Sequence, residues 1–482
     1  MNSGNNGTAP PLVPLWINGT AVDPEGADYL DDLCPLDDRV LARAAAARPS
    51  DVLRAVAAAS EAFATFRHST PRQREAWMNR AADLLLEREA ELVEVLIDEV
   101  GATLMKARYE VRFAADAFRA AAGVARHVTG QTLPSDVPGR VSLSFREPIG
   151  VIACITPFNV PLLKGAKLAS VPLATGNTVV LLPSEEAPLI AHHLARLLAD
   201  AGVPPGAFNV VSGRGEQIGD TLTTAPEVRA VSFTGSTRVG RHIRALAGQH
   251  GKRVLLELGG KNPLVVLADA DLPAAVQGAV FGNFVNQGQV CLASTRIYVQ
   301  RPVYRDFLQA FRKATETLGM GDQRRSDTMI GPIINRRQRD RVRSHIEDAL
   351  SKGAELVTGG TWDGHRCRPT ILAGVTPAMA VFAQETFGPV ASVYAVDTFE
   401  EALAAANATE YGLSASIYTR NLSHALRFAR EIRSGMVHIN APSNQDEPHV
   451  PFGGNGDSGY GREGTSVDID FLTEWKWVTV QL

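Results

Sequence analysis

Four short apolar runs between residues 149 and 233 decide the fold of this chain: IGVIACI (149–155), TVVLL (178–182), FNVVS (208–212) and RAVSF (229–233). Segments with helical periodicity separate them, such as APLIAHHLARLLADAG at residues 187–202. Strands that are apolar on both faces and alternate with helices are typical of parallel sheets covered on each side. The pattern therefore predicts βαβ units on a parallel sheet, and the predicted fold class is α/β.

A second series of the same kind follows Gly259. It contains PLVVL (263–267), a helical stretch AAVQGAVFGNFV (274–285) and TRIYVQ (295–300), and further candidates continue to about Asn440. We therefore expect a second α/β domain. Ahead of both series, residues 51–128 are rich in Ala, Leu, Glu and Arg with apolar residues at helical spacing, which indicates amphipathic scaffold helices.

Two distant segments alternate in polarity: RVSLSFR at residues 140–146 and EWKWVTVQL at residues 474–482. A period of two is typical of half-buried strands. We expect these two strands to pair with each other or with the sheet of another subunit.

Length and charge narrow the function classes. The chain has 482 residues, of which 45% are hydrophobic, so it can bury large cores and should divide into two or three domains. Its 48 basic and 52 acidic residues give a formal net charge of -4, without the basic excess that binding to a phosphate backbone requires. We therefore expect no nucleic-acid partner.

The N-terminal segment and the cysteines indicate the compartment. MNSGNNGTAPPLVP lacks a basic start followed by an apolar core, and no apolar stretch is long enough to span a bilayer. Cys34, Cys154, Cys291 and Cys367 lie far apart, without a CxxC pair or the spacing of zinc ligands. We expect a cytoplasmic protein with reduced thiols, no membrane partner and no metal.

Cys291 has the most distinctive surroundings of the four cysteines. It lies in NQGQVCLAS (286–294), where Gly288 allows close approach of the backbone. A thiolate that attacks a carbonyl needs donors for the developing oxyanion and a base for a later water molecule. On local sequence Cys291 is a candidate nucleophile, and it also fits the commoner role of a small buried residue, which we assign to the other three.

Two polar residues offer the base and the donor. Glu257 ends an apolar run in LLELGGK (255–261), where burial would raise its pKa and make it a usable base, although a strand-end carboxylate can also be solvated. Asn159 follows a strand in ITPFNVPLLKGAK (155–167), where its amide could point into a site or cap the next helix. Local sequence leaves both alternatives open.

Two segments bear on dinucleotide binding. Gly213, Gly215 and Gly219 approach the GxGxxG pattern, but their spacing is one residue too long. In VSFTGSTRVGRHI (231–243) a strand runs through Phe233 into a short turn and then a helix, whose free N–H groups could receive a pyrophosphate. The second segment is the better candidate.

Seven segments follow one another along the chain: TPFN, GNTVVLLPSE, FTGSTRVG, LELGGK, GQVC, ETFGP and PFGG. Together they resemble the aldehyde dehydrogenase superfamily over essentially the whole chain. The resemblance implies a homodimer or homotetramer with the fold of that family. It implies a Rossmann-like cofactor domain at 1–124 and 147–256, an α/β catalytic domain at 257–460, and a small β oligomerisation element at 125–146 and 461–482.

The resemblance also implies the chemistry. Cys291 would attack the aldehyde to give a thiohemiacetal, whose oxyanion is held by the Asn159 amide and the Cys291 backbone N–H. Hydride would pass to the nicotinamide, leaving a thioester. Glu257 would deprotonate the water that hydrolyses this thioester to the carboxylate, and it is also a candidate for activating the thiol at the start.

Cofactor contacts are implied in the same way. Glu185 would bind the adenosine ribose, the turn from Gly235 to Gly240 the pyrophosphate, and Glu385 the nicotinamide riboside. The full implied set is Thr156, Pro157, Ser184, Glu185, Gly215, Gly235, Ser236, Val239, Gly240, Leu258, Glu385 and Phe387. Family members usually carry Lys where this chain has Leu182, so a cation for a 2′-phosphate is missing. We therefore predict NAD+, with NADP+ as the alternative if another loop supplies the cation.

Three segments narrow the substrate: TPFNVPL, GGKNPLVVLADADL and DSGYGREG look most like the benzaldehyde, salicylaldehyde and vanillin dehydrogenases. An aromatic aldehyde is therefore implied, with Phe158, Val160 and Phe452 lining the pocket. The loop before PFGG contains Asp446 and Glu447 but no Lys or Arg, so a carboxylate-bearing semialdehyde would gain no partner there.

Two lysines near Asn159 have open roles. Lys164 lies about one helical turn after Asn159 and could bring a cation to the tunnel or lie in solvent. Lys167 falls one position earlier than a lysine that is common in the superfamily.

Three other functions are compatible with parts of this pattern. An aliphatic aldehyde or semialdehyde dehydrogenase would share the same machinery. A CoA-acylating relative commonly lacks the base that Glu257 would supply, and a non-enzymatic binding or structural member would tolerate loss of Cys291 or Glu257. The presence of both residues favours an NAD(P)-dependent aldehyde dehydrogenase that releases a carboxylate.

Overall fold

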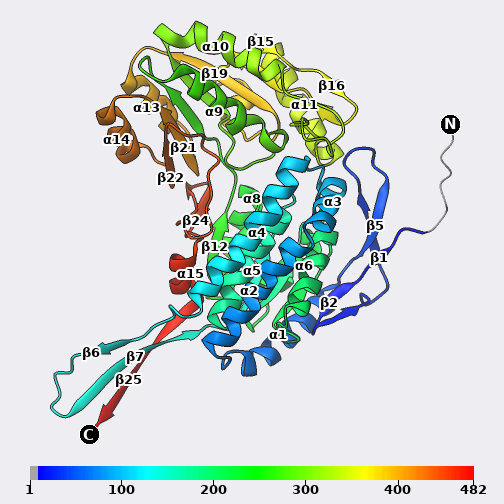
Figure 1. Ribbon diagram of the computed structural model, residues 1–482, viewed down its shortest axis with the longest axis vertical. Coiled ribbons are helices and arrows are strands. Elements are labelled where there is room, and N and C mark those ends of the chain that lie inside the picture. Colours follow the sequence, from blue (N-terminus) through cyan, green and yellow to red (C-terminus); the bar gives the residue numbers. More distant parts are fainter. Residues whose placement is uncertain (1–8) are drawn as a thin grey trace.

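The computed structural model describes residues 9–482 (Figure 1). Residues 1–8 lie outside this range, and with them the start of the predicted cofactor domain and part of the segment in which we expect no targeting signal. Within the described range, no helix is both long enough and apolar enough to cross a membrane.

The first large sheet is built from the four apolar runs. Its parallel strands lie in the order β12-β11-β8-β9-β10, which confirms the predicted parallel sheet. Their bounds are β8 (Val151–Ile155), β9 (Thr178–Leu182), β10 (Phe208–Val210), β11 (Val228–Thr234) and β12 (Arg253–Glu257). Antiparallel strands extend both edges: β24 (Gly459–Tyr460) beside β12, and β2 (Leu15–Ile17) with β3 (Thr20–Val22) beyond β10.

Helices cover both faces of this sheet (Figure 1). Alternate strand residues point to opposite faces, so Ile152 and Cys154 pack with one group of helices while Val151 and Ala153 pack with the other. The first group is α2 (Pro71–Glu87), α3 (Glu89–Val100), α4 (Leu104–Val124), α5 (Pro161–Thr175) and α6 (Pro188–Asp200). The second is α1 (Pro49–Phe66), α7 (Gly215–Thr224) and α8 (Thr237–Gln249). The helices predicted over residues 51–128 are therefore present.

The second large sheet forms the other lobe of Figure 1. Its order is β15 (Glu355–Thr358), β18 (Thr370–Ala373), β19 (Val390–Val396), β14 (Arg296–Gln300), β13 (Pro263–Val266), β21 (Ser414–Tyr418) and β22 (Met436–Ile439). Its helices are α9 (Leu272–Phe284), α10 (Arg301–Glu316), α11 (Arg336–Ser351), α12 (Ala380–Ala383), α13 (Phe399–Asn407) and α14 (Leu422–Glu431). Only β15 pairs antiparallel among these described strands, so the second α/β unit is confirmed.

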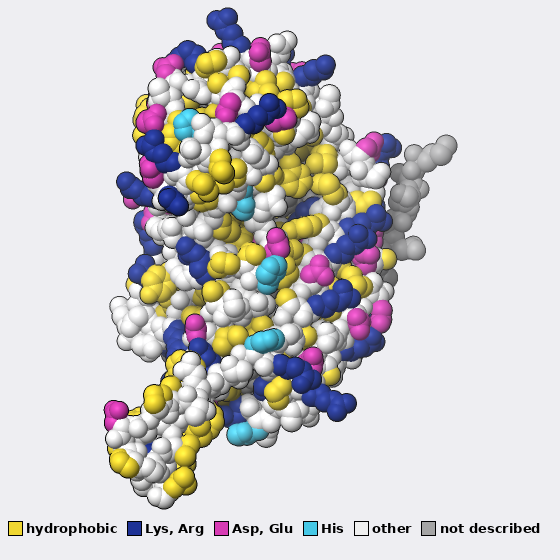
Figure 2. Space-filling model, turned by 60° about the vertical axis from the view of Figure 1, so that its left-hand side comes forward, with side chains coloured by type: hydrophobic (Ala, Val, Ile, Leu, Met, Phe, Trp, Pro, Cys, Tyr) yellow, Lys and Arg dark blue, Asp and Glu magenta, His cyan; other side chains and the backbone are white. Residues whose placement is uncertain are grey.

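A β arm projects from the body (Figures 1 and 2). It consists of β6 (Gln131–Leu133), β7 (Arg140–Pro148) and β25 (Thr473–Gln481), which follows α15 (Thr465–Leu472). β25 pairs with β7 along its whole length, which confirms the predicted pairing. The expectation of half-buried strands is wrong for β25: Trp475 and Trp477 are 49% and 67% exposed, because the arm stands away from the body.

The short strands lie outside these three sheets. They are β1 (Leu12–Val13), β4 (Tyr29–Leu33) and β5 (Val40–Ala45), and the pairs β16 (Trp362–Asp363) with β17 (Arg366–Cys367) and β20 (Tyr411–Gly412) with β23 (Asn455–Gly456).

Candidate functional site

The carboxyl ends of the central parallel strands meet at one edge of the first sheet. Phe233 is in register with Ile155, and Thr234 with Glu257, so the segments that follow these strands lie side by side. Ligands of open α/β sheets bind at this edge. The predicted cofactor residues brought together here are Thr156, Pro157, Ser184, Glu185, Gly235, Ser236 and Leu258.

The start of α8 offers an anion site at this edge. Ser236 is the N-cap and is exposed, and its hydroxyl accepts a hydrogen bond from the Val239 N–H at 3.4 Å. A side chain at position 240 would collide with Leu258, so Gly240 lets the helix start pack against the end of β12. Because the first N–H groups of a helix lack intrahelical partners, this geometry fits a pyrophosphate.

Glu185 and Leu182 differ sharply in exposure. The Glu185 carboxylate is exposed and accepts a hydrogen bond at 2.8 Å from the N–H of Gly215, the first residue of α7. Leu182 is buried in the core on the side of α1 and α7. Leu182, which replaces the usual lysine, therefore contributes to core packing, while the Glu185 carboxylate is accessible to solvent.

The loop that carries Cys291 has an unusual backbone. It follows the 3-10 turn η1 (Val285–Gly288), in which Asn286, Gln287 and Gly288 have φ of 52°, 55° and 68°. Left-handed backbone costs about 1–2 kcal/mol for a residue with a Cβ, and the surroundings offset this cost. Gln287 donates hydrogen bonds at 3.2 Å to the carbonyls of Gly101 and Pro332.

Cys291 is half-buried, whereas Cys34, Cys154 and Cys367 are buried. Its carbonyl accepts a hydrogen bond at 2.8 Å from the Asn262 amide. A side chain at position 260 would collide with the same carbonyl, so only glycine fits there. The ELGGK and GQVC segments are therefore in direct contact.

Charges around Cys291 act in opposite directions. Burial raises the pKa of its thiol to about 12. The Lys164 ammonium lowers the pKa, while the carboxylates of Glu385, Glu257 and Asp446 raise it further. The resting cysteine is accordingly a thiol.

Asn159 is held against the Cys291 loop. Its amide Nδ2 donates to the carbonyl of Gln289 at 2.9 Å, and the Asn286 amide donates to the Asn159 carbonyl at 3.3 Å. The alternative of a helix cap is wrong, because α5 begins after Val160, which is its half-buried N-cap. Glu110 accepts hydrogen bonds from the first N–H groups of that helix instead.

Glu257 is the last residue of β12, and its carboxylate is buried. Among the described residues, neither oxygen has a hydrogen-bond partner. A side chain at Gly453 would come within 2.5 Å of its Oε1. Burial, followed by the nearby Glu463 carboxylate, raises the pKa of Glu257 well above its ordinary value. The alternative of a solvated strand-end carboxylate is therefore wrong.

Glu385 and Phe387 lie beside the glycines of the ELGGK segment. The Gly260 N–H donates to Glu385 Oε1 at 3.1 Å, and a side chain at Gly259 would approach Glu385 Oε2 to 2.6 Å. Burial raises the pKa of Glu385, and the Gly260 N–H counteracts this. The Phe387 ring stands edge-on to Phe158, with centroids 5.7 Å apart.

Phe452 lies under two ammonium groups. Lys164 Nζ and Lys167 Nζ are 4.7 and 4.5 Å from its ring centroid. Both lysines are buried and paired: Lys164 with Glu463 at 2.8 Å, and Lys167 with Asp446 at 2.9 Å. The alternative of a solvated Lys164 is wrong, and both ammonium groups have a carboxylate partner.

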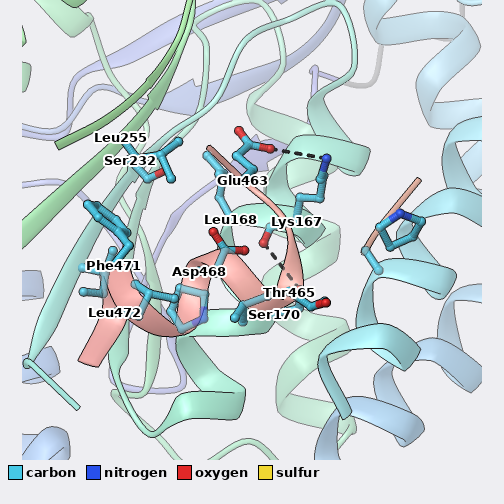
Figure 3. A pocket seen from close by; sticks show the side chains of 15 residues that line it. Lys167, Leu168, Ser170, Ser232, Leu255, Glu463, Thr465, Asp468, Phe471 and Leu472 are labelled. Carbon is cyan, nitrogen blue, oxygen red and sulfur yellow. Dashed lines mark hydrogen bonds and ion pairs between the residues drawn. The ribbon is translucent and has the colours of Figure 1, made fainter. Parts of the chain in front are cut away.

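Nothing in the sequence indicated that Glu463 and Asp468 belong to the site, because carboxylates usually lie in solvent. Figure 3 shows both beside Lys167, around a cavity of about 20 Å³, which is room for about one water molecule. Burial, then Glu463, raises the pKa of Asp468 to about 7. Buried acidic and basic side chains, among them Glu463, Lys164 and Lys167, therefore lie near Glu257.

Comparison with known proteins agrees with this geometry. The model of the aldehyde dehydrogenase family matches residues 21–478. Vanillin dehydrogenase of Pseudomonas fluorescens is 40% identical over 472 residues, which cover 97% of this chain and 98% of that protein.

Two solved structures have the same fold. A salicylaldehyde dehydrogenase from Pseudomonas putida G7, complexed with salicylaldehyde, has a TM-score of 0.95 and 37% identity, covering 98% of each chain. An NAD-dependent aldehyde dehydrogenase from Sinorhizobium meliloti has a TM-score of 0.95 and 38% identity, covering 98% of this chain and 95% of that one. The chain belongs to the aldehyde dehydrogenase family.

Proposed function

We propose that this chain oxidises an aromatic aldehyde to the carboxylate with NAD+ as hydride acceptor. Similarity to vanillin and salicylaldehyde dehydrogenases supports the substrate class. The ring of Phe158 and the half-buried Val160 offer apolar surface for an aromatic ring. The Phe452 side chain, by contrast, is buried, with the Lys164 and Lys167 ammonium groups over its ring. Lys164 and Lys167 are already paired with carboxylates, so an anionic substrate would find no unpaired ammonium there.

The observation that carries the mechanism is the hydrogen bond from Asn159 to Gln289. This bond uses one hydrogen of the Asn159 amide and leaves the second for an acceptor bound at Cys291. Gln289 precedes Cys291 by two residues in the same loop. An amide N–H fixed before the reaction stabilises an oxyanion without reorganisation. We assign Cys291 as nucleophile, and the Asn159 amide with the Cys291 N–H as oxyanion donors.

Glu257 fits the role of general base for deacylation. Its carboxylate is buried, yet neither oxygen is committed to a hydrogen bond among the described residues. A base with a raised pKa removes a proton from water more readily than an ordinary carboxylate. In this role, Glu257 takes the proton of the water that attacks the thioester on Cys291.

The residues at the strand ends fit the dinucleotide. Ser236 and the start of α8 would hold the pyrophosphate, and the exposed Glu185 a ribose. Glu385 would hold the riboside next to the nicotinamide. When bound, NAD+ supplies the hydride acceptor. Glu185 would repel a 2′-phosphate and the buried Leu182 offers no cation, which supports NAD+ over NADP+.

A substrate panel tests this proposal. We expect kcat/KM for benzaldehyde and hydroxylated benzaldehydes to exceed that for hexanal and succinic semialdehyde by at least about tenfold, because an apolar pocket favours flat rings. NAD+ should be preferred to NADP+ with the same substrate. Faster oxidation of succinic semialdehyde would contradict the substrate class, and a clear NADP+ preference would contradict the cofactor.

The β arm supports a further proposal, that the chain forms a homodimer or homotetramer. Figure 2 shows apolar side chains along the arm. On β25, the side chains of Trp475, Trp477 and Val480 are exposed. Exposed apolar patches of this kind mark interaction sites. We also propose the domain division given above and, because all four cysteines are free, a cytoplasmic location.

Light scattering after size-exclusion chromatography tests the assembly. We expect a species of at least twice the chain mass, and a smaller one after Trp475→Lys with Trp477→Lys, since charge on this patch opposes burial. Leu422→Lys on α14 is the matched control, because Leu422 is at least as exposed as the two tryptophans but lies outside the arm. A monomeric parent protein would refute the proposal.

A further inference from the structure

Lys164 and Glu463 form an ion pair inside the protein. Nζ lies 2.8 Å from each carboxylate oxygen, and the two side chains are 4% and 3% exposed. Lysine is almost never fully buried unless it is paired, and burying a pair is costly compared with apolar packing. A pair at this position therefore calls for a role other than stability.

The pair is oriented by Phe452. The backbones of Glu463 and Phe452 exchange two hydrogen bonds, of 2.7 and 2.8 Å, which fix the residue that carries the carboxylate. The Lys164 ammonium lies over the Phe452 ring, 4.7 Å from its centroid. Phe452 packs with Leu292 and Leu413 in a cluster that Cys291 joins. The Lys164 ammonium and Cys291 therefore both lie close to Phe452.

Cys291 otherwise faces negative groups. The charged groups with the largest effects on its pKa come from four places: Lys164 near the start of α5, Glu257 at the end of β12, Glu385 ahead of β19, and Asp446 in the loop before Phe452. Of these, Lys164 is the positive one. Without it, a thiolate here would face three carboxylates.

Lys167 does not take this place. It binds both oxygens of Asp446 at 2.9 Å and approaches Glu463 only to 3.5 Å. The two buried lysines therefore have different main partners: Lys164 is paired with Glu463, and Lys167 with Asp446.

We propose that Lys164 is a positioning residue for the nucleophile: its ammonium, which is paired with Glu463, stabilises the thiolate that forms when the Cys291 thiol releases its proton to water. The inference rests on the proposed role of Cys291. It adds a residue that acts on the nucleophile through its charge, without touching the substrate.

The test is the rate at which iodoacetamide alkylates Cys291 in the intact enzyme at a fixed, mildly alkaline pH, where the rate follows the thiolate fraction. Cys291→Ala gives the background from the three buried cysteines. Lys164→Met is expected to slow alkylation at least about tenfold, the effect of one pKa unit. Lys164→Arg should restore most of the rate. Lys313→Met, at an exposed position on α10, should leave it unchanged.

Glu463→Gln separates charge from packing. It breaks the same ion pair but keeps the cation, so alkylation should not slow. If Lys164→Met does not fold, Lys164→Met with Glu463→Gln removes both charges and should slow alkylation by a similar factor. Equal rates for Lys164→Met and the parent, or equal slowing by Lys164→Met and Glu463→Gln, would overturn the inference. Alkylation needs no turnover, so failure of the proposed function would show separately, as activity retained by Cys291→Ala.

Discussion

Cys291→Ala is expected to abolish NADH formation from every aldehyde, with a loss of at least about 10⁴-fold in kcat. Without the sulfur, no thiohemiacetal forms, and hydride would have to leave an aldehyde carbon that carries no negative oxygen. The Cys291 loop is fixed by backbone contacts to Asn262 and by the Asn159 amide, so the alanine variant should keep its fold. NADH formation with benzaldehyde measures the effect.

Cys367→Ala is the matched control for a lost thiol. Cys367 is buried in β17, in the core cluster around α11 and away from the strand ends that form the site. It should retain most of the activity. Comparable activity in Cys291→Ala and Cys367→Ala would refute Cys291 as the nucleophile.

Glu257→Gln is expected to release about one NADH per active site in a rapid burst and then nearly stop, with steady-state turnover lowered about 10²–10⁴-fold. Gln fills the same space beside Gly453 but cannot take a proton from water, so the thioester on Cys291 should accumulate. Stopped-flow measurement of NADH separates the burst from the slow phase. A uniformly slow reaction without a burst would instead assign Glu257 to the first step.

The pH profile of the parent enzyme provides the control for this assignment. Because the pKa of Glu257 is raised, mainly by burial and then by Glu463, its base form is absent at low pH and appears as pH rises through the raised value. Turnover limited by deacylation should therefore increase with pH, with an inflection well above the ordinary range of a carboxylic acid. Glu257→Gln should lack this inflection.

The sequence predicted the sheet because its strands are apolar on both faces, as strands between two helix layers must be. The order of the strands could not be predicted in this way. For example, β24 lies more than two hundred residues after β11 yet joins the same sheet beside β12. Period two alone also could not tell a buried face from an exposed one. For that reason the exposure of Trp477 on the arm was missed.

Sequence-based prediction could place residues at or just after the end of a strand, as Glu257 and Ser236 are, because parallel strands end at one edge of the sheet; the roles of these residues stay predictions. It failed for Lys164 and Glu463, which are about three hundred residues apart and look like solvated charges in sequence. Only folding shows that each is the other's partner. The left-handed backbone at Asn286 and Gln287 was likewise hidden, since neither residue type requires it.

The most direct test of the covalent mechanism is peptide mass mapping of Glu257→Gln, quenched after mixing with benzaldehyde and NAD+. We predict one benzoyl group per chain, located on the peptide that contains Cys291. NADH formation with an unmodified Cys291 peptide, or a benzoyl group on another residue, would contradict the account.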